Sequence, residues 1–177
     1  KLVGDEWVHV GQEDYYTPRL VFNNELYAEG LLGAYKLVGN EWVPVGKREI
    51  SPILVNNNEL YGYAASGVLD EDVIGTYSLE NGEWIQVNTD PTIIPVKTFD
   101  GKVYGEYNTN FISVKDERYI GEYGKTYRLS GKTWVEDLMP KIIYKGQMYT
   151  DDPQAVYKLD GRKWTKIASN YNEDERY

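Results

Sequence analysis

The fold is decided by a segment that reads Tyr35-Lys36-Leu37-Val38-Gly39-Asn40-Glu41-Trp42-Val43-Pro44-Val45. Leu follows the first Tyr by two residues, a centre containing Gly comes next, and Trp stands seven residues after the Tyr. Large and polar residues that alternate around a short turn are typical of a β-hairpin, with Leu and Trp on the buried face. We therefore predict two paired strands here.

All five tryptophans of the chain occur in such a unit. The same step from Tyr to Trp recurs in Tyr77–Trp84, Tyr127–Trp134 and Tyr157–Trp164. The segment Lys1–Val10 is the same unit around Trp7, without the initial Tyr. A pattern that returns in this way predicts a repeat protein, in which the tryptophans form the core.

A second recurring unit lies between the Trp-containing units. It runs from a Pro to a Tyr nine residues later, in Pro18–Tyr27, Pro52–Tyr61, Pro95–Tyr104 and Pro140–Tyr149. Its centre is an Asn-Asn, Asp-Gly or Lys-Gly pair, and such pairs tolerate the positive φ of a tight hairpin turn. Each unit is predicted to be a further hairpin, with Pro at the strand entrance. Two hairpins together make one four-stranded antiparallel sheet.

Four strands in about 40 residues is the period of a β-propeller blade. At these residues the chain resembles the kelch repeat, with a hydrophobic strand, a turn containing Asn or Gly, an apolar-Tyr pair, and then the Tyr-to-Trp step. Kelch blades usually carry a Gly-Gly pair after the second strand, where this chain has Gly62-Tyr63 or Gly105-Glu106. The resemblance implies an all-β fold, a small propeller similar in size class to the five-bladed tachylectin-type lectins.

We expect a single domain over residues 1–177 with five blades, closed by the two ends of the chain. The ends would share one blade, since Asp174-Glu175-Arg176-Tyr177 repeats Asp116-Glu117-Arg118-Tyr119. A disordered acidic tail explains the same residues. Four complete blades with an extra hairpin, or a fragment of a larger propeller, are the alternative architectures. The expected units are a hairpin at 1–10, blades at 18–46, 52–88, 95–138 and 140–168, and a closing hairpin at 169–177.

Two insertions interrupt the repeat. In the third blade, either Pro95–Tyr104 is the first hairpin and Asn110–Tyr119 is inserted, or the roles are reversed. A smaller insertion spans Tyr63–Thr76. With Pro95–Tyr104 as the first hairpin, both insertions connect the second and third strands of their blades. In propellers these connections emerge on the face that usually binds partners.

Composition excludes several classes of function. The chain has no Cys, so disulfides and thiolate chemistry are excluded, and His9 is the only histidine, which excludes His-based triads and metal sites within one chain. A net charge of −9 argues against nucleic acid as a ligand. No apolar run approaches the roughly 18 residues of a transmembrane helix, so we expect no membrane insertion. No cofactor, metal or catalytic residue is predicted.

We predict a non-enzymatic recognition module whose asymmetric loop face binds a protein or a glycan. Exposed aromatic rings beside Asn and Asp suit sugars, and they suit protein partners equally. One alternative is a glycan-cleaving enzyme that uses carboxylates among Asp70, Asp72, Asp116 and Glu117. Another is a structural component of a surface, fibre or virion assembly. The candidate binding residues are Tyr15, Tyr16, Tyr63, Asp70, Asp72, Tyr107, Asn110, Phe111 and Tyr119.

Overall fold

The structure is a computed structural model, and it describes residues 2–3, 6–7, 15–65, 73–107, 125–152 and 154–169. This part of the chain is all-β and contains no helix. A two-stranded hairpin, β1 (Leu2–Val3) and β2 (Glu6–Trp7), precedes four antiparallel sheets of four strands each. The predicted all-β class and the four-stranded sheets are therefore confirmed.

In each sheet the strands lie side by side in the order of the chain. The first sheet contains β3 (Thr17–Phe22), β4 (Glu25–Gly30), β5 (Gly33–Val38) and β6 (Glu41–Arg48). The second contains β7 (Ser51–Asn56), β8 (Glu59–Ala64), β9 (Gly75–Glu80) and β10 (Glu83–Asn88). The third contains β11 (Ile93–Phe99), β12 (Lys102–Tyr107), β13 (Thr126–Ser130) and β14 (Thr133–Glu136). The fourth contains β15 (Ile142–Tyr144), β16 (Gln147–Asp151), β17 (Ala155–Asp160) and β18 (Lys163–Ser169).

The turn of the first hairpin has the same backbone shape in all four sheets. Asn23 and Asn24 adopt φ of 48° and 61°, and Asn57 and Asn58 repeat these values. Both central residues also have positive φ at Asp100-Gly101 and at Lys145-Gly146. Two successive positive φ angles are the signature of a type I′ turn, whose twist matches that of the flanking strands. The turn chemistry in the sequence thus fixes the register of these hairpins.

In the first three sheets the proline of the first hairpin lies beside a β-bulge. The pairing shifts between Pro18 and Leu20, between Pro52 and Leu54, and between Pro95 and Lys97. A bulge leaves one residue unpaired and increases the local twist, and a proline without an N–H loses no ladder bond there.

The pairing of the third sheet decides between the two registers considered for this region. Strand β12 pairs with β11 on one side and with β13 on the other. The hairpin of Pro95 and Tyr104 is therefore the first hairpin of the sheet, and the insertion connects β12 to β13. Residues 108–124, like 66–72, lie outside the described part of the chain.

Apolar side chains from adjacent sheets form two core clusters. The first joins the first two sheets and includes Tyr27, Leu60 and Trp84. The second joins the second and third sheets and includes Tyr61 and Trp134. Each cluster thus combines a repeat Tyr from one sheet with the Trp of the sheet that follows. The predicted core role of the tryptophans therefore holds for Trp84 and Trp134.

The two most buried tryptophans of the described residues lie over glycines. The Trp84 ring lies directly over the Cα of Gly62. A Cβ atom added to Gly62 would lie 2.8 Å from this ring. A Cβ on Gly105 would lie 3.0 Å from the Trp134 ring. Trp84 and Trp134 are 4% and 9% exposed. The indole of Trp84 also donates a hydrogen bond to the Val45 carbonyl oxygen of the preceding sheet, at 3.0 Å.

In the other two sheets a larger residue stands where these glycines stand. The register places Ala28 opposite Tyr35 and Thr150 opposite Tyr157, as Gly62 is opposite Tyr77. The tryptophans of these sheets, Trp42 and Trp164, are only partly buried. Ala28 and Thr150 therefore accompany tryptophans that are less buried than those over Gly62 and Gly105.

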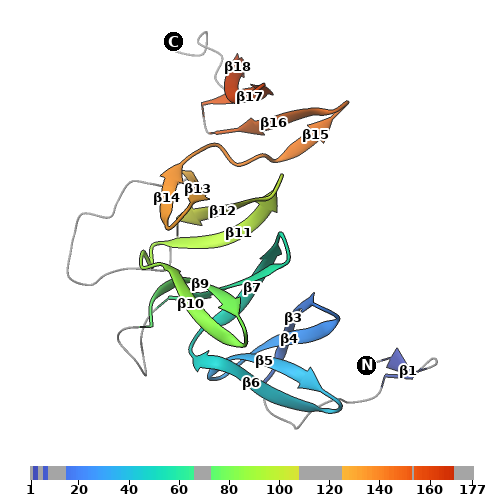
Figure 1. Cartoon of the computed structure of the whole chain (residues 1–177). Coiled ribbons are helices and arrows are strands. Elements are labelled where there is room, and N and C mark those ends of the chain that lie inside the picture. The colour runs from blue at the N-terminus through green and yellow to red at the C-terminus, as the bar shows by residue number, and fades with distance from the viewer. Residues whose placement is uncertain are drawn as a thin grey trace, which may run out of the picture.

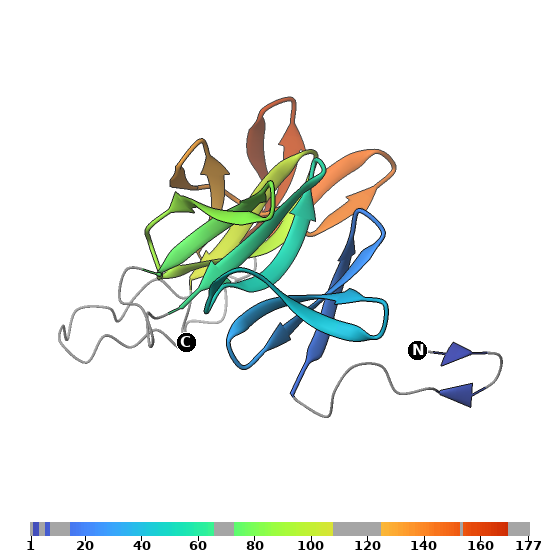
Figure 2. The same cartoon turned by 60° about the horizontal axis from the view of Figure 1, so that its bottom comes forward.

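The four sheets follow one another in a row that bends into an open arc (Figures 1 and 2). The first strands of neighbouring sheets adjoin, since β7 contacts both β3 and β11. The β1–β2 hairpin and the fourth sheet lie at opposite ends of the row (Figure 1). No strand of the described fourth sheet pairs with the first sheet, so the arc is not closed. Of the predicted closing hairpin at 169–177, Ser169 is the last residue of β18, and residues 170–177 lie outside the described part.

Candidate functional site

A cleft of about 890 Å³ lies where the first sheet meets the second. Its walls come from β3, β4, β7 and β8, with Ile94 of β11 at one side. It opens at the end of the sheets where the connections β4–β5, β6–β7 and β8–β9 lie, because residues of all three line it. This is the face that the sequence predicted for binding.

A polar network crosses the cleft between the two sheets. Arg19 Nε donates to Glu29 Oε2 at 2.9 Å, and the guanidinium forms an ion pair with the same carboxylate. Ser51 Oγ of the second sheet donates to Glu29 Oε1 at 2.6 Å. Burial alone would raise the pKa of Glu29, but the hydrogen bond from Ser51 and the charge of Arg19 outweigh it, so the pKa is lowered. Glu29 is held ionised, which makes it a poor proton donor.

The rim of the cleft is apolar. Leu31, in the connection between β4 and β5, is 88% exposed. Its neighbour Leu32 accepts a backbone hydrogen bond from Glu49 at 2.9 Å, and Glu49 adopts a φ of 71°. This hydrogen bond links the β4–β5 connection to the β6–β7 connection. Leu31 therefore lies on a turn that is fixed by a neighbouring segment.

Tyr63 forms part of the cleft wall, and its side chain does not project into solvent. Its side chain is only 6% exposed, and its hydroxyl donates to the carbonyl oxygen of Pro91. Pro52, Ile53 and Ile94 supply further apolar lining. A mostly apolar pocket with a few fixed polar groups is the usual composition of a binding site. The arrangement suits an apolar group that carries a polar or charged neighbour.

The predicted binding residues fall into three groups. Of them, Tyr63 alone among the described residues lines the cleft. Tyr15 is 90% exposed, whereas Tyr16 packs against Trp42 and Tyr35, with ring centroids 5.6 and 4.8 Å away. Tyr107 is half-buried at the end of β12. The remaining candidates lie outside the described residues and stay predictions: Asp70, Asp72, Asn110, Phe111 and Tyr119.

Sequence reasoning missed Arg19, Glu29, Ser51 and Leu31. The first three occupy ordinary strand positions, and nothing in the repeat marks them as partners across a sheet boundary. Leu31, in contrast, could have been recognised from the sequence. Leu31-Leu32 occupies a two-residue connection after Gly30, a place where polar turn residues are the rule.

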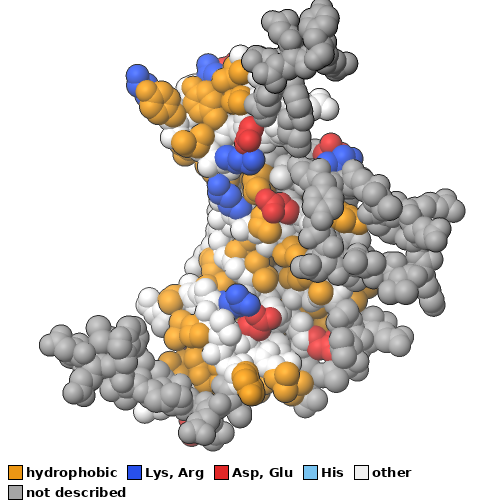
Figure 3. Space-filling model, turned by 180° about the vertical axis from the view of Figure 1, so that it is seen from behind, with side chains coloured by type: hydrophobic (Ala, Val, Ile, Leu, Met, Phe, Trp, Pro, Cys, Tyr) orange, Lys and Arg blue, Asp and Glu red, His pale blue; other side chains and the backbone are white. Residues whose placement is uncertain are grey.

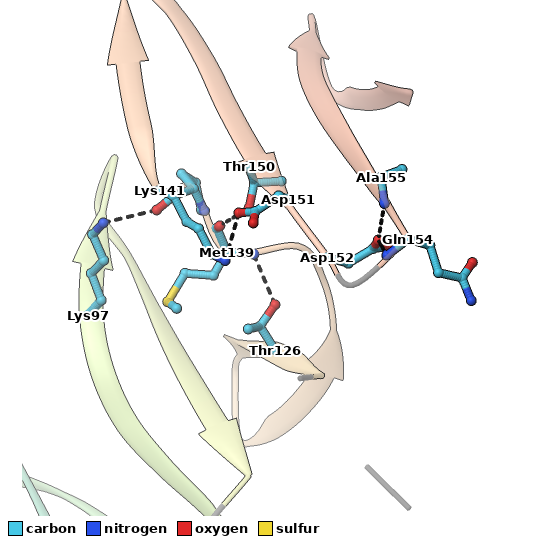
Figure 4. A network of polar contacts seen from close by, with 10 residues as sticks. Lys97, Thr126, Met139, Lys141, Thr150, Asp151, Asp152, Gln154 and Ala155 are labelled. Carbon is cyan, nitrogen blue, oxygen red and sulfur yellow. Dashed lines mark hydrogen bonds and ion pairs between the residues drawn. The ribbon is translucent and has the colours of Figure 1, made fainter. Parts of the chain in front are cut away.

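A second polar cluster lies where the third sheet leads into the fourth, and its contacts indicate a structural role (Figure 4). Thr126 Oγ1 accepts from the Met139 amide at 3.0 Å, and Thr150 Oγ1 donates to the Met139 carbonyl oxygen at 2.5 Å. Lys97 Nζ donates to the Pro140 carbonyl oxygen at 3.0 Å. These bonds satisfy the backbone of the connecting segment and fix the position of the fourth sheet.

Several charged groups on the surface form pairs of opposite sign. Seen from behind, Lys and Arg groups lie beside Asp and Glu groups, with hydrophobic side chains between them (Figure 3). Examples are Lys141 with Asp151 at 2.7 Å and Arg128 with Asp137 at 2.8 Å. The densest acidic pair of the described part, Asp151-Asp152, is thus engaged, since Asp152 accepts from the Ala155 amide at 2.8 Å.

The described residues contain no group of three or more His, Asp or Glu that could hold a metal ion. They also contain no helix long and apolar enough to cross a lipid bilayer. No family model matches the chain, and no curated protein or solved structure shows significant similarity to it. The candidate site therefore depends on its own geometry.

Proposed function

We propose that the chain is a recognition module that binds a protein partner through the cleft between the first and second sheets. The observation that carries the proposal is the exposure of Leu31. This side chain is 88% exposed, on a turn held by the Glu49–Leu32 hydrogen bond, beside a mostly apolar cleft. Exposed apolar groups gathered at a concave site are typical of interaction surfaces.

A protein partner is favoured over a glycan because of the tyrosine in the cleft. Sugar recognition commonly uses an accessible aromatic face, and the Tyr63 ring is buried with its hydroxyl engaged by Pro91. An apolar side chain of a partner can instead fill the space beside Leu31 and Ile53, with Arg19 and Glu29 within reach of polar groups that flank it.

The site is proposed to be single, because the connections differ between sheets. The connection between the second and third strands has two residues in the first sheet, Leu31 and Leu32. In the second sheet β8 ends at Ala64 and β9 begins at Gly75, and in the third β12 ends at Tyr107 and β13 begins at Thr126. A repeated lectin would need equivalent loops in each unit.

We also propose that the four sheets are blades of a propeller-like arrangement, with a kelch-like repeat. The adjoining first strands, β3, β7 and β11, support a radial arrangement of the sheets. Closure into a five-bladed ring stays a prediction.

Selection of binders from a random-peptide display library on the immobilised chain tests the recognition proposal. We expect the selected peptides to bind a Leu31→Asp variant at least about tenfold more weakly, a loss of roughly 1.4 kcal/mol. Val38→Asp is the matched control, since Val38 is also exposed on a hairpin end but lies away from the cleft lining. Peptides that bind both variants equally well would rule out the cleft. Hydrolysis of arrayed glycans would instead support the enzymatic alternative.

A further inference from the structure

The two ends of the row of sheets expose surfaces that are buried where the first sheet meets the second and where the second meets the third. In the first sheet Leu20 is paired with Tyr27, and in the second Leu54 is paired with Tyr61. Both pairs pack against the sheet that follows them. In the fourth sheet the same register pairs Ile142 with Tyr149. This pair and the side of the fourth sheet that carries it are called the tail face.

The tail face lacks the cover that its equivalents have. Tyr27, Tyr61 and Tyr104 are 3%, 8% and 4% exposed. Tyr149 is only partly buried, and Ile142 is 60% exposed. The difference arises because no described sheet follows the fourth, whereas each of the other three sheets is followed by another.

The opposite end of the row exposes the complementary surface. The second sheet packs against the Leu20–Tyr27 pair with Val55, Leu60 and Trp84. In the first sheet the register places Val21, Leu26 and Trp42 at these positions. They are called the head face.

The head face is also incompletely covered. Val21 is 63% exposed, and Leu26 and Trp42 are partly exposed, whereas Leu60 and Trp84 are buried. Tyr16 stacks on Trp42 and leaves Val21 open to solvent. The two exposed apolar faces thus occupy the register positions of the two halves of an interface that the chain already builds internally.

We propose that the tail face of one copy of this chain docks on the head face of a second copy. The contact would continue the interface between the first and second sheets across the boundary between two molecules. A second copy is favoured as the occupant because the two faces lie at opposite ends of the row in one molecule (Figure 1). Such a contact joins different surfaces of identical molecules, so it leads to open chains of molecules, or to a ring of several copies if the rotation closes.

Two single substitutions test the two faces independently. Ile142→Glu places a carboxylate in the tail face, and Val21→Glu places one in the head face. Both side chains are mostly exposed in the single chain, so each variant is expected to fold, as circular dichroism can verify. Ile85→Glu is the matched control, since Ile85 is exposed on β10 of an interior sheet and belongs to neither face.

Analytical ultracentrifugation measures the outcome. We expect the average mass of the unmodified chain and of the Ile85→Glu variant to rise with concentration, and each face variant alone to stay monomeric. A mixture of the two face variants should form a one-to-one dimer and nothing larger, because one intact interface remains.

Three results would overturn the proposal. They are a monomeric unmodified chain at every concentration, assembly that survives either face substitution, and a mixture that stays monomeric. The first of these would favour closure within one molecule, with the tail face covered by another segment of the same chain. Since this result requires only the unmodified chain, the proposal can fail even if a variant does not fold.

Discussion

The Trp84→Ala variant tests the central packing argument. The Trp84 ring is 4% exposed, lies over Gly62, and donates a hydrogen bond to the Val45 carbonyl oxygen at 3.0 Å. Truncation of a buried Trp costs about 3 to 5 kcal/mol. Loss of the donor also leaves a buried carbonyl without this partner, at a cost on the order of 1 kcal/mol, which places the expected loss in the upper part of that range.

The loss can be measured by urea denaturation followed by circular dichroism. Trp164→Ala is the internal comparison, because Trp164 is only partly buried and belongs to the fourth sheet, so its truncation should cost less than about 3 kcal/mol. Total stabilities of domains are typically about 5 to 15 kcal/mol, so Trp84→Ala should move the transition to much lower urea. Equal losses for the two variants would refute the reasoning that sheet contacts, and not the repeat position alone, decide the contribution of each Trp.

Two further predictions concern the glycine and tyrosine positions of the repeat. Gly105→Ala should destabilise the fold by about 1 to 3 kcal/mol, because the added Cβ would lie 2.7 Å from Ile93 and 3.0 Å from Trp134. Thermal unfolding measures this loss of stability, with Lys102→Ala, at an exposed position, as the control. Burial, and then the hydrogen bond to Glu25, raises the pKa of Tyr27 from 10.0 to about 12. The folded state therefore holds the phenolic proton more tightly, and this stabilising contribution is present below pH 10 and lost as the pH rises through 12. The stability of a Tyr27→Phe variant should therefore fall less between pH 10 and pH 12 than that of the unmodified chain. The same pH dependence of stability in both proteins would contradict the raised pKa of Tyr27.

The repeat made the sheets predictable from the sequence. Turn pairs such as Asn57-Asn58 specify type I′ turns, and the constant Tyr-to-Trp step specifies the second hairpin. These are local signals, carried by residues close together in the chain, so strand existence and order follow from them. The Leu-Trp pairs lie directly opposite each other, as at Leu79 and Trp84.

Contacts between sheets were less accessible to sequence reasoning. The partnership of Ser51 and Glu29 depends on how one sheet is placed on another, and alternation within strands does not encode that placement. The glycines beneath Trp84 and Trp134 stand where kelch blades usually carry a Gly-Gly pair, but their physical role required the position of the rings. The predicted closure would depend on residues 169–177, whose sequence shows little of the repeat.

The segment through Met139 and Pro140 has a mechanical consequence. Every extensive contact between sheets in the described part joins neighbours, and both core clusters lie among the first three sheets. Hydrogen bonds link this connecting segment to Lys97 and Thr126 of the third sheet and to Thr150 of the fourth. Systems with only nearest-neighbour coupling lose structure from the end with the weakest junction. Under load or heat the molecule should therefore release its last sheet as a separate cooperative unit, while the remaining sheets stay folded.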